Sequence, residues 1–322
     1  MNRAVLTIAT GKDLYLRMAV ALARSFRIWH RDSDIGFVLA TDLPDLVPPD
    51  LDWVDTVPLQ PGQYGRGFSP KLYLNEISPA QRTLFVDADC LCVGSLDSVF
   101  DRFENMPVSV IGREISEGEW FGDVASICQS FGVPAIPRFN GGVYYFERGE
   151  TSDAVFRTAQ DLQSRYDDIG FVRLRESPND EVLMALSMAL HGQRPVPDDG
   201  TIMNSTLAAP GGVEVDVLKG VSRFRNPKSH PEHNSWYQME EMRPVLAHFL
   251  GYQTTRYPYR REAIRLERVF ASGWPPSLAR LWTGATFSLP WLATNAAKDA
   301  LRPLYHRLFG ARPVRYSTAD RV

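Results

Sequence analysis

The sequence predicts an α/β fold, with a mixed, mostly parallel sheet, flanking helices and a C-terminal helical segment. Short apolar runs rich in β-branched residues alternate with runs of helical periodicity, which is the pattern of parallel strands joined by helices. Several of these runs stop at polar or glycine residues, as strands do where they present their carboxyl ends. With 322 residues, 44% of them hydrophobic, the chain can bury a large core in one or two domains.

The first elements are predicted to be a strand, a helix and two further strands. Residues 4–10 (AVLTIAT) form an apolar run that ends in Thr-Gly, and residues 13–29 place apolar side chains at helical spacing. Residues 35–41 (IGFVLAT) repeat the strand pattern, and residues 53–59 are a weaker strand between prolines. This order indicates the start of a parallel sheet.

The apolar run at residues 82–86 ends in an Asp-Ala-Asp motif (RTLFVDADCLC). A strand end holds side chains rigidly, and two carboxylates one residue apart can share a hard divalent cation. Asp87 and Asp89 are therefore candidate metal ligands. Ligands of open α/β sheets bind outside the carboxyl ends of the strands, so we expect Thr10 and Thr41 to face the same ligand.

The middle of the chain adds one strand and two helices. Residues 139–146 (FNGGVYYF) are a strand entered through Asn-Gly-Gly, and residues 152–166 and 180–191 have helical periodicity. We expect Ser152 and Asp153 to begin the first of these helices. The sequence Ser-Pro-Asn-Asp begins the second, with acidic residues near the positive end of the helix dipole.

The last part of the main body is predicted to be mostly loops. Residues 195–231 are rich in Pro, Gly, Asn and Asp and contain short strands such as residues 213–217. Residues 245–250 (VLAHFL) are one more apolar strand, which carries a single histidine, His248, and ends at Gly251.

Composition and charge exclude several classes of protein. A net charge of −3 and a pI near 6.1 give no overall attraction to nucleic acid. The three cysteines, Cys90, Cys92 and Cys128, are expected to be reduced core residues, which favours the cytoplasm. The N-terminal residues do not match a signal peptide, and no run of about 18 apolar residues would span a membrane.

The composition changes near residue 258, and we expect residues 1–258 to form one domain and residues 259–322 a basic amphipathic tail. Residues 272–322 contain seven basic and two acidic residues, a net charge of +5. Residues 295–309 alternate basic and apolar positions at helical spacing. Such a helix suits the inner face of a membrane, and a helix packed on the domain with a solvated basic face is the alternative.

The strand-end motifs, taken in order, resemble the family-8 glycosyltransferases, the group that contains glycogenin and bacterial lipopolysaccharide galactosyl- and glucosyltransferases. The resemblance covers residues 4–258 and rests on six pieces of sequence: ATGKDLY, SPKLYL, LFVDADCL, FNGGVYYF, NDEVLMAL and HFLG. It implies a GT-A fold and transfer of a sugar from a nucleotide sugar, such as a UDP-hexose, to a glycan or lipid-linked acceptor. It also implies retention of the anomeric configuration.

The resemblance also implies a set of site residues. Mn²⁺ or Mg²⁺ would be held by Asp87, Asp89 and His248, and Asp180 and Glu181 would lie at the transferred sugar as catalytic residues. The residues that would bind the nucleotide sugar are Thr10, Tyr15, Lys71, Asp87, Ala88, Asn140, Gly141, Gly142, Gly251 and Arg256.

Two departures from the family pattern concern the donor site. The family continues His-Phe-x-Gly-x-x-Lys-Pro-Trp, whereas this chain reads HFLGYQTTRYP and has Thr254 at the lysine position, with Arg256 two residues later. Glu181 stands where the family has an amide, which would change sugar recognition or introduce a base.

Two other classes of protein remain open from the sequence. A sugar nucleotidyltransferase uses a similar sheet, but it would need a glycine-rich, basic phosphate loop that Ala-Thr-Gly-Lys is too short to form. A non-catalytic nucleotide-sugar-binding or scaffold protein on the same fold is the second. Metal-dependent nucleotide binding would separate these classes.

Overall fold

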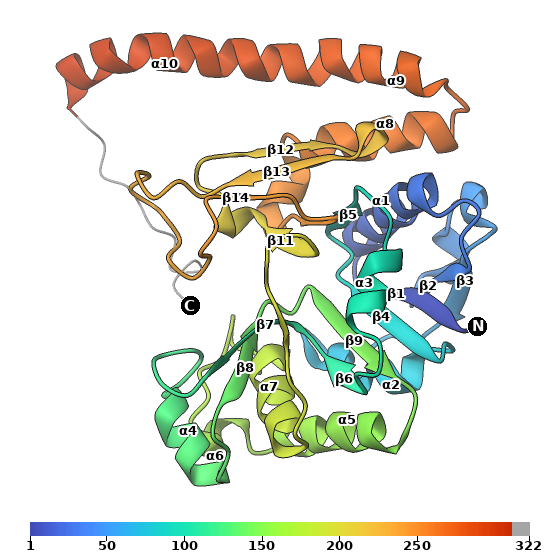
Figure 1. Cartoon of the computed structure of the whole chain (residues 1–322). Coiled ribbons are helices and arrows are strands. Elements are labelled where there is room, and N and C mark those ends of the chain that lie inside the picture. Colours follow the sequence, from blue (N-terminus) through green and yellow to red (C-terminus); the bar gives the residue numbers. More distant parts are fainter. Residues whose placement is uncertain (311–322) are drawn as a thin grey trace.

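A six-stranded mixed sheet forms the centre of the computed structural model, which describes residues 1–310 (Figure 1). In spatial order its strands are β3 (Asp55–Pro58), β2 (Ile35–Thr41), β1 (Arg3–Ala9), β4 (Arg82–Val86), β9 (Val143–Glu147) and β6 (Val108–Ser109). β1 pairs in parallel with β2 and β4, and β2 with β3. β9 runs antiparallel to β4 and β6. The predicted mixed, mostly parallel sheet is confirmed.

Helices cover both faces of this sheet because successive residues of its strands point to opposite sides. Val5 of β1 packs in one core layer with α1 (Asp13–Trp29). Leu6 packs in the other layer with α5 (Glu150–Gln163) and α7 (Asp180–Leu190). Side chains of the central strands are therefore buried on both faces, which explains why these strands read as continuous apolar runs.

The elements predicted for the first 60 residues agree with the structure to within two residues at most ends. The start predicted for the helix at residues 152–166 is wrong, because α5 begins at Glu150, directly after Gly149. Ser152 is only 1% exposed and lies on the buried face of the helix, so it does not cap the helix. For α7 the prediction is confirmed, since the side chain of Asn179 accepts a hydrogen bond from the N–H of Glu181.

Three smaller sheets surround the central one. The first contains β10 (Val196–Pro197), β7 (Ile111–Ile115) and β8 (Ile136–Phe139). The second contains β11 (Met203–Ser205), β15 (Leu246–His248) and β5 (Cys90–Cys92), and the third contains β12 (Val213–Asp216), β13 (Val221–Arg225) and β14 (Glu241–Met242). The remaining short helices of the body are α2 (Leu74–Ile77), α3 (Asp97–Arg102), α4 (Val124–Phe131) and α6 (Tyr166–Ile169).

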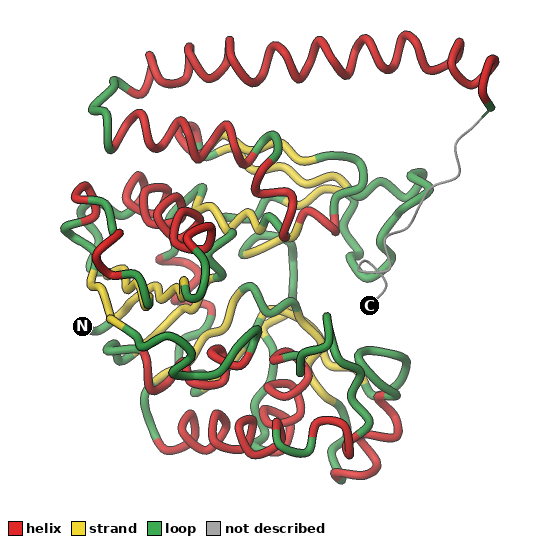
Figure 2. The backbone as a smooth tube through the Cα atoms, turned by 180° about the vertical axis from the view of Figure 1, so that it is seen from behind, coloured by secondary structure: helices red, strands yellow, loops and turns green. Residues whose placement is uncertain are grey.

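The C-terminal segment consists of α8 (Tyr259–Phe270), α9 (Pro276–Thr283), a π-helical stretch at residues 284–288 and α10 (Leu289–Phe309). α8 packs against α1, and its buried Arg265 pairs with Asp216 and Glu262 at 3.0 Å each. Figures 1 and 2 show α9 and α10 as one long rod along the edge of the molecule, with α8 between the α9 end of the rod and the body. None of the residues of α10 is buried.

Among residues 1–310, no helix combines the length and the apolar character that crossing a membrane requires. The three cysteines are free and buried, as predicted. Arg312, Arg315, Asp320 and Arg321 of the predicted basic tail lie outside the described residues.

Candidate active site

The Asp-Ala-Asp motif lies between β4 and β5, and β15 brings a histidine to it. β15 runs antiparallel to β5, with His248 opposite Cys90. His248 Nε2 is 3.1 Å from Asp89 Oδ1 and 3.9 Å from Asp87 Oδ2. Burial alone would lower the pKa of His248, but Asp89 and Asp87 outweigh it and raise that pKa. The three residues expected to bind metal are thus in one place, although they come from distant parts of the chain.

One buried polar atom at this place, His248 Nδ1, has no hydrogen-bond partner among the described residues, and the buried Asp89 Oδ1 has only its contact with His248 Nε2. Ligand atoms of Asp89, Cys90 and His248 lie within 4.8 Å of one another. Cys90 is the weaker ligand of the three, because burial and then the carboxylates Asp89 and Asp87 raise the pKa of its thiol far above the usual value, and metals bind the thiolate. Carboxylate oxygens with one imidazole fit Mn²⁺ or a similar divalent cation.

Lys71 joins the Asp-Ala-Asp motif to the turn at residues 140–142, which precedes β9. The helical turn at residues 69–73 directs its Nζ to Asp87 Oδ2 at 2.9 Å and to the carbonyl oxygen of Gly141 at 2.8 Å. Asp180 Oδ2 is 3.7 Å away. Burial would lower the pKa of Lys71, but Asp180 and Asp87 more than compensate and raise it. The ammonium is therefore charged and shared by two carboxylates.

The first turn of α7 supplies two further carboxylates. Asp180 is only 2% exposed and accepts a hydrogen bond from the hydroxyl of Tyr144. Glu181 Oε1 accepts a hydrogen bond of 2.7 Å from the N–H of Gly141. Burial, followed by the charge of Asp180, raises the pKa of Glu181 to about 7. Glu181 can therefore gain or lose a proton near neutral pH.

The turn at residues 140–142 requires small residues because side chains from neighbouring elements crowd it. A Cβ atom on Gly142 would lie 2.7 Å from His248 Nδ1, and one on Gly141 would lie 3.0 Å from Glu181 Cγ. The side chain of Asn140 accepts a hydrogen bond from the N–H of Gly142 at 3.0 Å. The carbonyl of Gly142 accepts one from the N–H of Asp87 at 2.9 Å. The turn thus fixes Asp87 of the Asp-Ala-Asp motif relative to Glu181 of α7.

The remaining residues of the predicted donor site lie around this cluster. Thr10 follows β1, and the N–H of the next residue, Gly11, donates to the carboxylate of Asp42 at 2.9 and 3.1 Å. Tyr15, in the first turn of α1, is 40% exposed. No hydrogen bond or ion pair joins Thr10 or Tyr15 to the cluster within the described part of the chain. Ala88 is half-buried between the two aspartates.

Gly251 begins a short helical turn three residues after His248, and this turn contains Thr254. Thr254 is buried, and its hydroxyl donates to the carbonyl of Gly251 at 2.9 Å. Thr254 therefore stabilises the turn and does not replace a phosphate-binding lysine. Arg256 is exposed directly after the turn.

Sequence reasoning missed Tyr144, Arg138 and Tyr237. Burial, and then Asp180 and Glu181, raise the pKa of the Tyr144 phenol far above its usual value. Burial raises the pKa of the Tyr237 phenol, with smaller contributions from Asp198 and Glu181. Tyr144 stands in the quoted FNGGVYYF motif and could have been noticed there, whereas Tyr237 lies in an irregular loop without periodicity.

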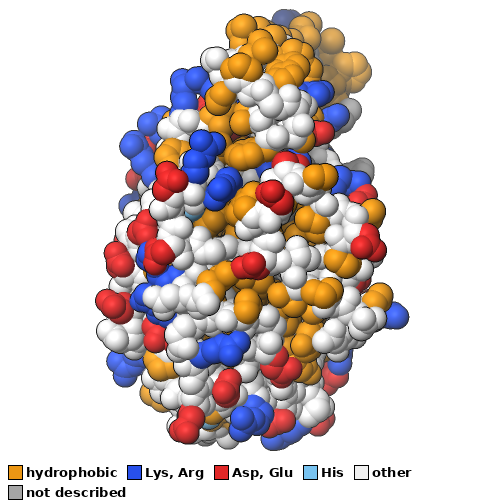
Figure 3. Space-filling view, turned by 90° about the vertical axis from the view of Figure 1, so that its right-hand side faces the viewer, with side chains coloured by type: hydrophobic (Ala, Val, Ile, Leu, Met, Phe, Trp, Pro, Cys, Tyr) orange, Lys and Arg blue, Asp and Glu red, His pale blue; other side chains and the backbone are white. Residues whose placement is uncertain are grey.

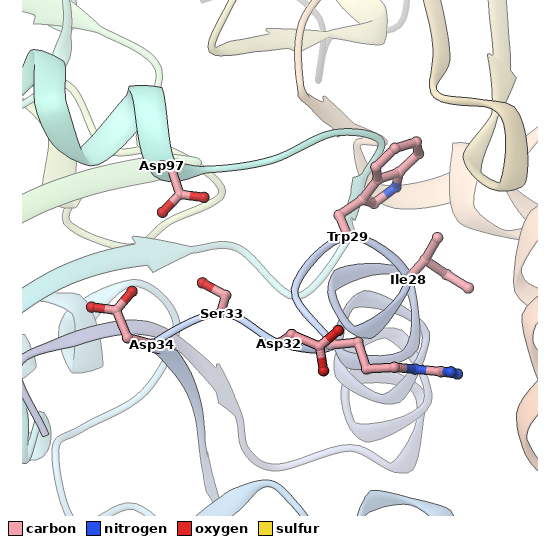
Figure 4. A pocket seen from close by; sticks show the side chains of 7 residues that line it. Ile28, Trp29, Asp32, Ser33, Asp34 and Asp97 are labelled. Atoms are coloured by element: carbon pink, nitrogen blue, oxygen red, sulfur yellow. The ribbon is translucent and has the colours of Figure 1, made fainter.

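A surface hollow lies elsewhere, at the amino ends of the strands (Figure 4). It is open and is lined by Ile28, Trp29, Arg31, Asp32, Ser33, Asp34 and Asp97. Asp34 and Asp97 both pair with Arg3, the first residue of β1. The hollow is therefore at the opposite end of the sheet from the Asp-Ala-Asp motif and is separate from the candidate site.

Comparisons with known proteins identify the fold. No model of a known family matches the sequence, and no curated protein matches it. Two similar solved structures are of LgtC, one an active-site mutant in which glutamate replaces glutamine and one the galactosyltransferase in complex with donor and acceptor sugar analogues. The mutant is 15% identical in sequence, and the match covers 80% of this chain and 93% of the mutant chain. The complex is 13% identical, and the match covers 83% of this chain and 96% of that chain. Both have a TM-score of 0.51.

The bifunctional glycosyltransferase WbbM is similar at the same TM-score of 0.51, with 10% identity. The match covers 82% of this chain and 49% of that chain, so this chain spans about half of WbbM. At these identities the likeness concerns the fold. The chain therefore has the mixed α/β fold of GT-A glycosyltransferases, as the sequence predicted.

Proposed function

We propose that this protein is a metal-dependent glycosyltransferase that moves a hexose from a nucleotide sugar to a glycan or lipid-linked acceptor with retention of the anomeric configuration. The proposed donor is a UDP-hexose. The observation that carries the proposal is one cluster at the carboxyl ends of the strands. In it, Lys71 is hydrogen-bonded to Asp87 and lies 3.7 Å from Asp180, which joins the candidate metal ligands to the α7 carboxylates. The GT-A fold and the position of the cluster agree with this function.

Asp87, Asp89 and His248 would hold Mn²⁺ or Mg²⁺, and the closeness of the ligand atoms of Asp89 and His248 supports this assignment. When bound, the cation supplies Lewis acidity for the negative charge that develops on a diphosphate leaving group. Lys71 adds a positive charge at the same place. Its charged ammonium is held in position by Asp87 and Asp180 before a ligand binds.

Other residues of this chain would bind the donor. Thr10 follows β1, Tyr15 in the first turn of α1 presents an exposed ring that can stack on a base, and Arg256 supplies an exposed cation near Gly251. The backbone of the turn at residues 140–142 carries no bulky side chain, so a sugar can approach it closely.

Asp180 and Glu181 would act on the transferred sugar. A buried carboxylate stabilises positive charge on the sugar ring strongly, and Asp180 is held in place by Tyr144 and Lys71. Glu181, with a pKa of about 7, is suited to accept a proton or to act as a carboxylate nucleophile. One similar LgtC structure is an active-site mutant in which glutamate replaces glutamine. This chain carries a glutamate at position 181.

The acceptor is proposed to be a glycan on a lipid at an anionic membrane surface facing the cytoplasm. Figure 3 shows apolar side chains gathered over the α9–α10 segment. The exposed apolar residues of the segment are Leu278, Leu281, Leu289, Trp291, Leu292, Leu301, Leu304, Leu308 and Phe309. Arg280, Lys298, Arg302 and Arg307 provide positive charge beside them. Apolar insertion together with about 1 kcal/mol per basic residue would hold the rod at such a surface.

A panel of UDP-, GDP- and CMP-sugars tests the proposal by thermal shift and by donor hydrolysis, each with and without Mn²⁺. We expect one nucleotide class to raise the melting temperature only with metal and to be hydrolysed slowly to free sugar. Metal-dependent binding without hydrolysis or transfer would indicate the non-catalytic alternative. No binding of any nucleotide sugar would reject the proposal.

A further inference from the structure

Two arginines lie opposite each other beside the candidate site. Arg113 of β7 and Arg138 of β8 are direct partners in the antiparallel register. Like charges in this arrangement repel, and burial together with Arg113 lowers the pKa of Arg138. Neither guanidinium has a hydrogen bond or ion pair with any described residue. Two cations with no acidic partner among residues 1–310, placed together at an energetic cost, favour the binding of an anion beside them.

An aromatic ring holds the two guanidinium groups in position. Arg113 Cζ is 3.7 Å and Arg138 Cζ is 4.0 Å from the centre of the Trp236 ring. Two planar groups so close to the ring centre cannot share one face, so they lie on opposite faces of the indole. Stacking uses the faces of a guanidinium and leaves its N–H groups at the edge free to donate. The donors of Arg113 and Arg138 are thus oriented but unused.

The loop that carries Trp236 is closed by its own hydrogen bonds. The N–H of Asn226 donates to the carbonyl of Glu240 at 2.8 Å. The fully buried side chain of Asn226 donates to the carbonyl of Asn234 and accepts from its N–H, both at 2.9 Å. Trp236 therefore has a fixed support, and the two arginines need little ordering when a ligand binds.

The arginine pair lies next to the proposed catalytic carboxylates. Arg138 is two residues before Asn140, and the charge of Glu181 acts on the pKa of Arg138. Figure 1 shows β7 and β8 on the other side of β9 from β1 and β2, whose ends would hold the nucleotide. A ligand at Arg113 and Arg138 would thus approach Glu181 from the side opposite the nucleotide.

We propose that Arg113 and Arg138, stacked on the two faces of Trp236, bind an oxyanion, a phosphate or carboxylate, on the acceptor. This inference rests on the proposed function, because it assigns the acceptor side of the same site. Guanidinium groups match the paired oxygens of both anions and form charge-assisted hydrogen bonds with them. The pair would select acceptors that carry such a group near the hydroxyl that receives the sugar.

The test titrates the full-length protein, in saturating UDP and Mn²⁺ at constant ionic strength, with inorganic phosphate, hexose 6-phosphate and hexuronate. Calorimetry and tryptophan fluorescence report binding. We expect at least one of these anions to bind, and Arg113→Gln and Arg138→Gln each to weaken it at least about tenfold. Arg194→Gln is the matched control. The side chain of Arg194 is 79% exposed and forms one long ion pair, 3.7 Å from Glu114, so its loss should change the anion affinity less than about twofold.

Three results would overturn the proposal. The wild-type protein could bind none of the anions, or Arg113→Gln could bind them with wild-type affinity. The variants could also weaken the binding of a neutral methyl hexoside as much as that of the anions, which would mean that the arginines only support the loop. A fourth comparison uses UDP-hexuronate and UDP-hexose. If Arg138→Gln weakens only UDP-hexuronate, the pair binds the donor sugar and the acceptor assignment is wrong. If UDP itself fails to bind, the proposed function is rejected, while the same anion titrations without UDP still decide whether the arginines bind oxyanions.

Discussion

Glu181 accepts a hydrogen bond from Gly141 and lies beside the buried Asp180, and this environment predicts how the protein responds to pH. Its pKa rises from 4.5 to about 7 on folding. Between these values the folded state keeps a proton that the unfolded state releases, so the free energy of unfolding falls as pH rises and stays lower above pH 7. The loss is about 3 kcal/mol.

We therefore expect Glu181→Gln to stabilise the metal-free protein at pH 8 and to have little effect at pH 4.5. Urea unfolding at the two pH values in EDTA measures this difference. In turnover, the wild-type rate should rise through pH 7, and Glu181→Gln should lower kcat about 100-fold and remove that rise. A variant with wild-type kcat and an unchanged pH profile would contradict the role of Glu181.

Asp180→Asn should lower kcat by about 10²- to 10³-fold while the affinity for the donor changes little, because the charge of Asp180 acts most strongly on the transition state. Steady-state kinetics and a separate UDP titration measure the two effects. Asp153→Asn is the control, since Asp153 is exposed on α5, where it accepts a hydrogen bond from Asn75. A loss of donor affinity with an unchanged kcat would show that Asp180 acts in binding alone.

At the scale of residues, the sequence indicated the acidic tip, His248 and the α7 carboxylates because each lies at a strand or helix end with a recognisable motif. Their mutual contacts with Lys71 remained unknown until the fold placed them together. Arg138 and Trp236 could not be predicted as a pair, because the loop of Trp236 has no periodicity and β8 is only four residues long.

At the scale of elements, α10 has 21 residues and none of them is buried, so its apolar side chains contribute nothing to the core of the described chain. α9 differs, because Ala279 and Thr283 are fully buried and Thr283 accepts a hydrogen bond from Arg265 of α8. The sequence predicted an amphipathic tail for both helices. It could not separate the docked helix from the exposed one, since both have apolar residues at helical spacing.

We expect truncation after Ser288, which removes α10 and keeps α9, to leave the melting temperature within a few degrees of the full-length value and to abolish sedimentation with anionic liposomes at low salt. Leu301→Ser/Leu308→Ser, both in exposed positions, should weaken liposome binding without loss of stability. If the full-length protein stays in the supernatant, the membrane contact is wrong. A large drop in melting temperature on truncation would instead show that α10 caps the domain.

At the scale of the whole molecule, the alternation of strands and helices predicted the central sheet, because parallel strands buried on both faces leave a clear apolar signal. The three smaller sheets were mostly missed, since β10 and β14 contain two residues each and β5 and β11 three. These short strands are formed by pairing partners far away in the sequence. Yet β5 and β15 are the elements that bring His248 to Asp89, so the metal ligands depend on contacts that local sequence patterns do not encode.

The central claim is that the Asp-Ala-Asp tip and His248 bind a nucleotide diphosphate through a divalent cation. Calorimetric titration of UDP with and without Mn²⁺, on the wild-type protein and on Asp89→Asn, tests it most directly. We predict that UDP binds the wild-type protein tightly only with Mn²⁺, and that Asp89→Asn weakens this binding at least about tenfold with an unchanged melting temperature in EDTA. UDP affinity that is equal with and without Mn²⁺, or equal in the two proteins, would contradict the claim.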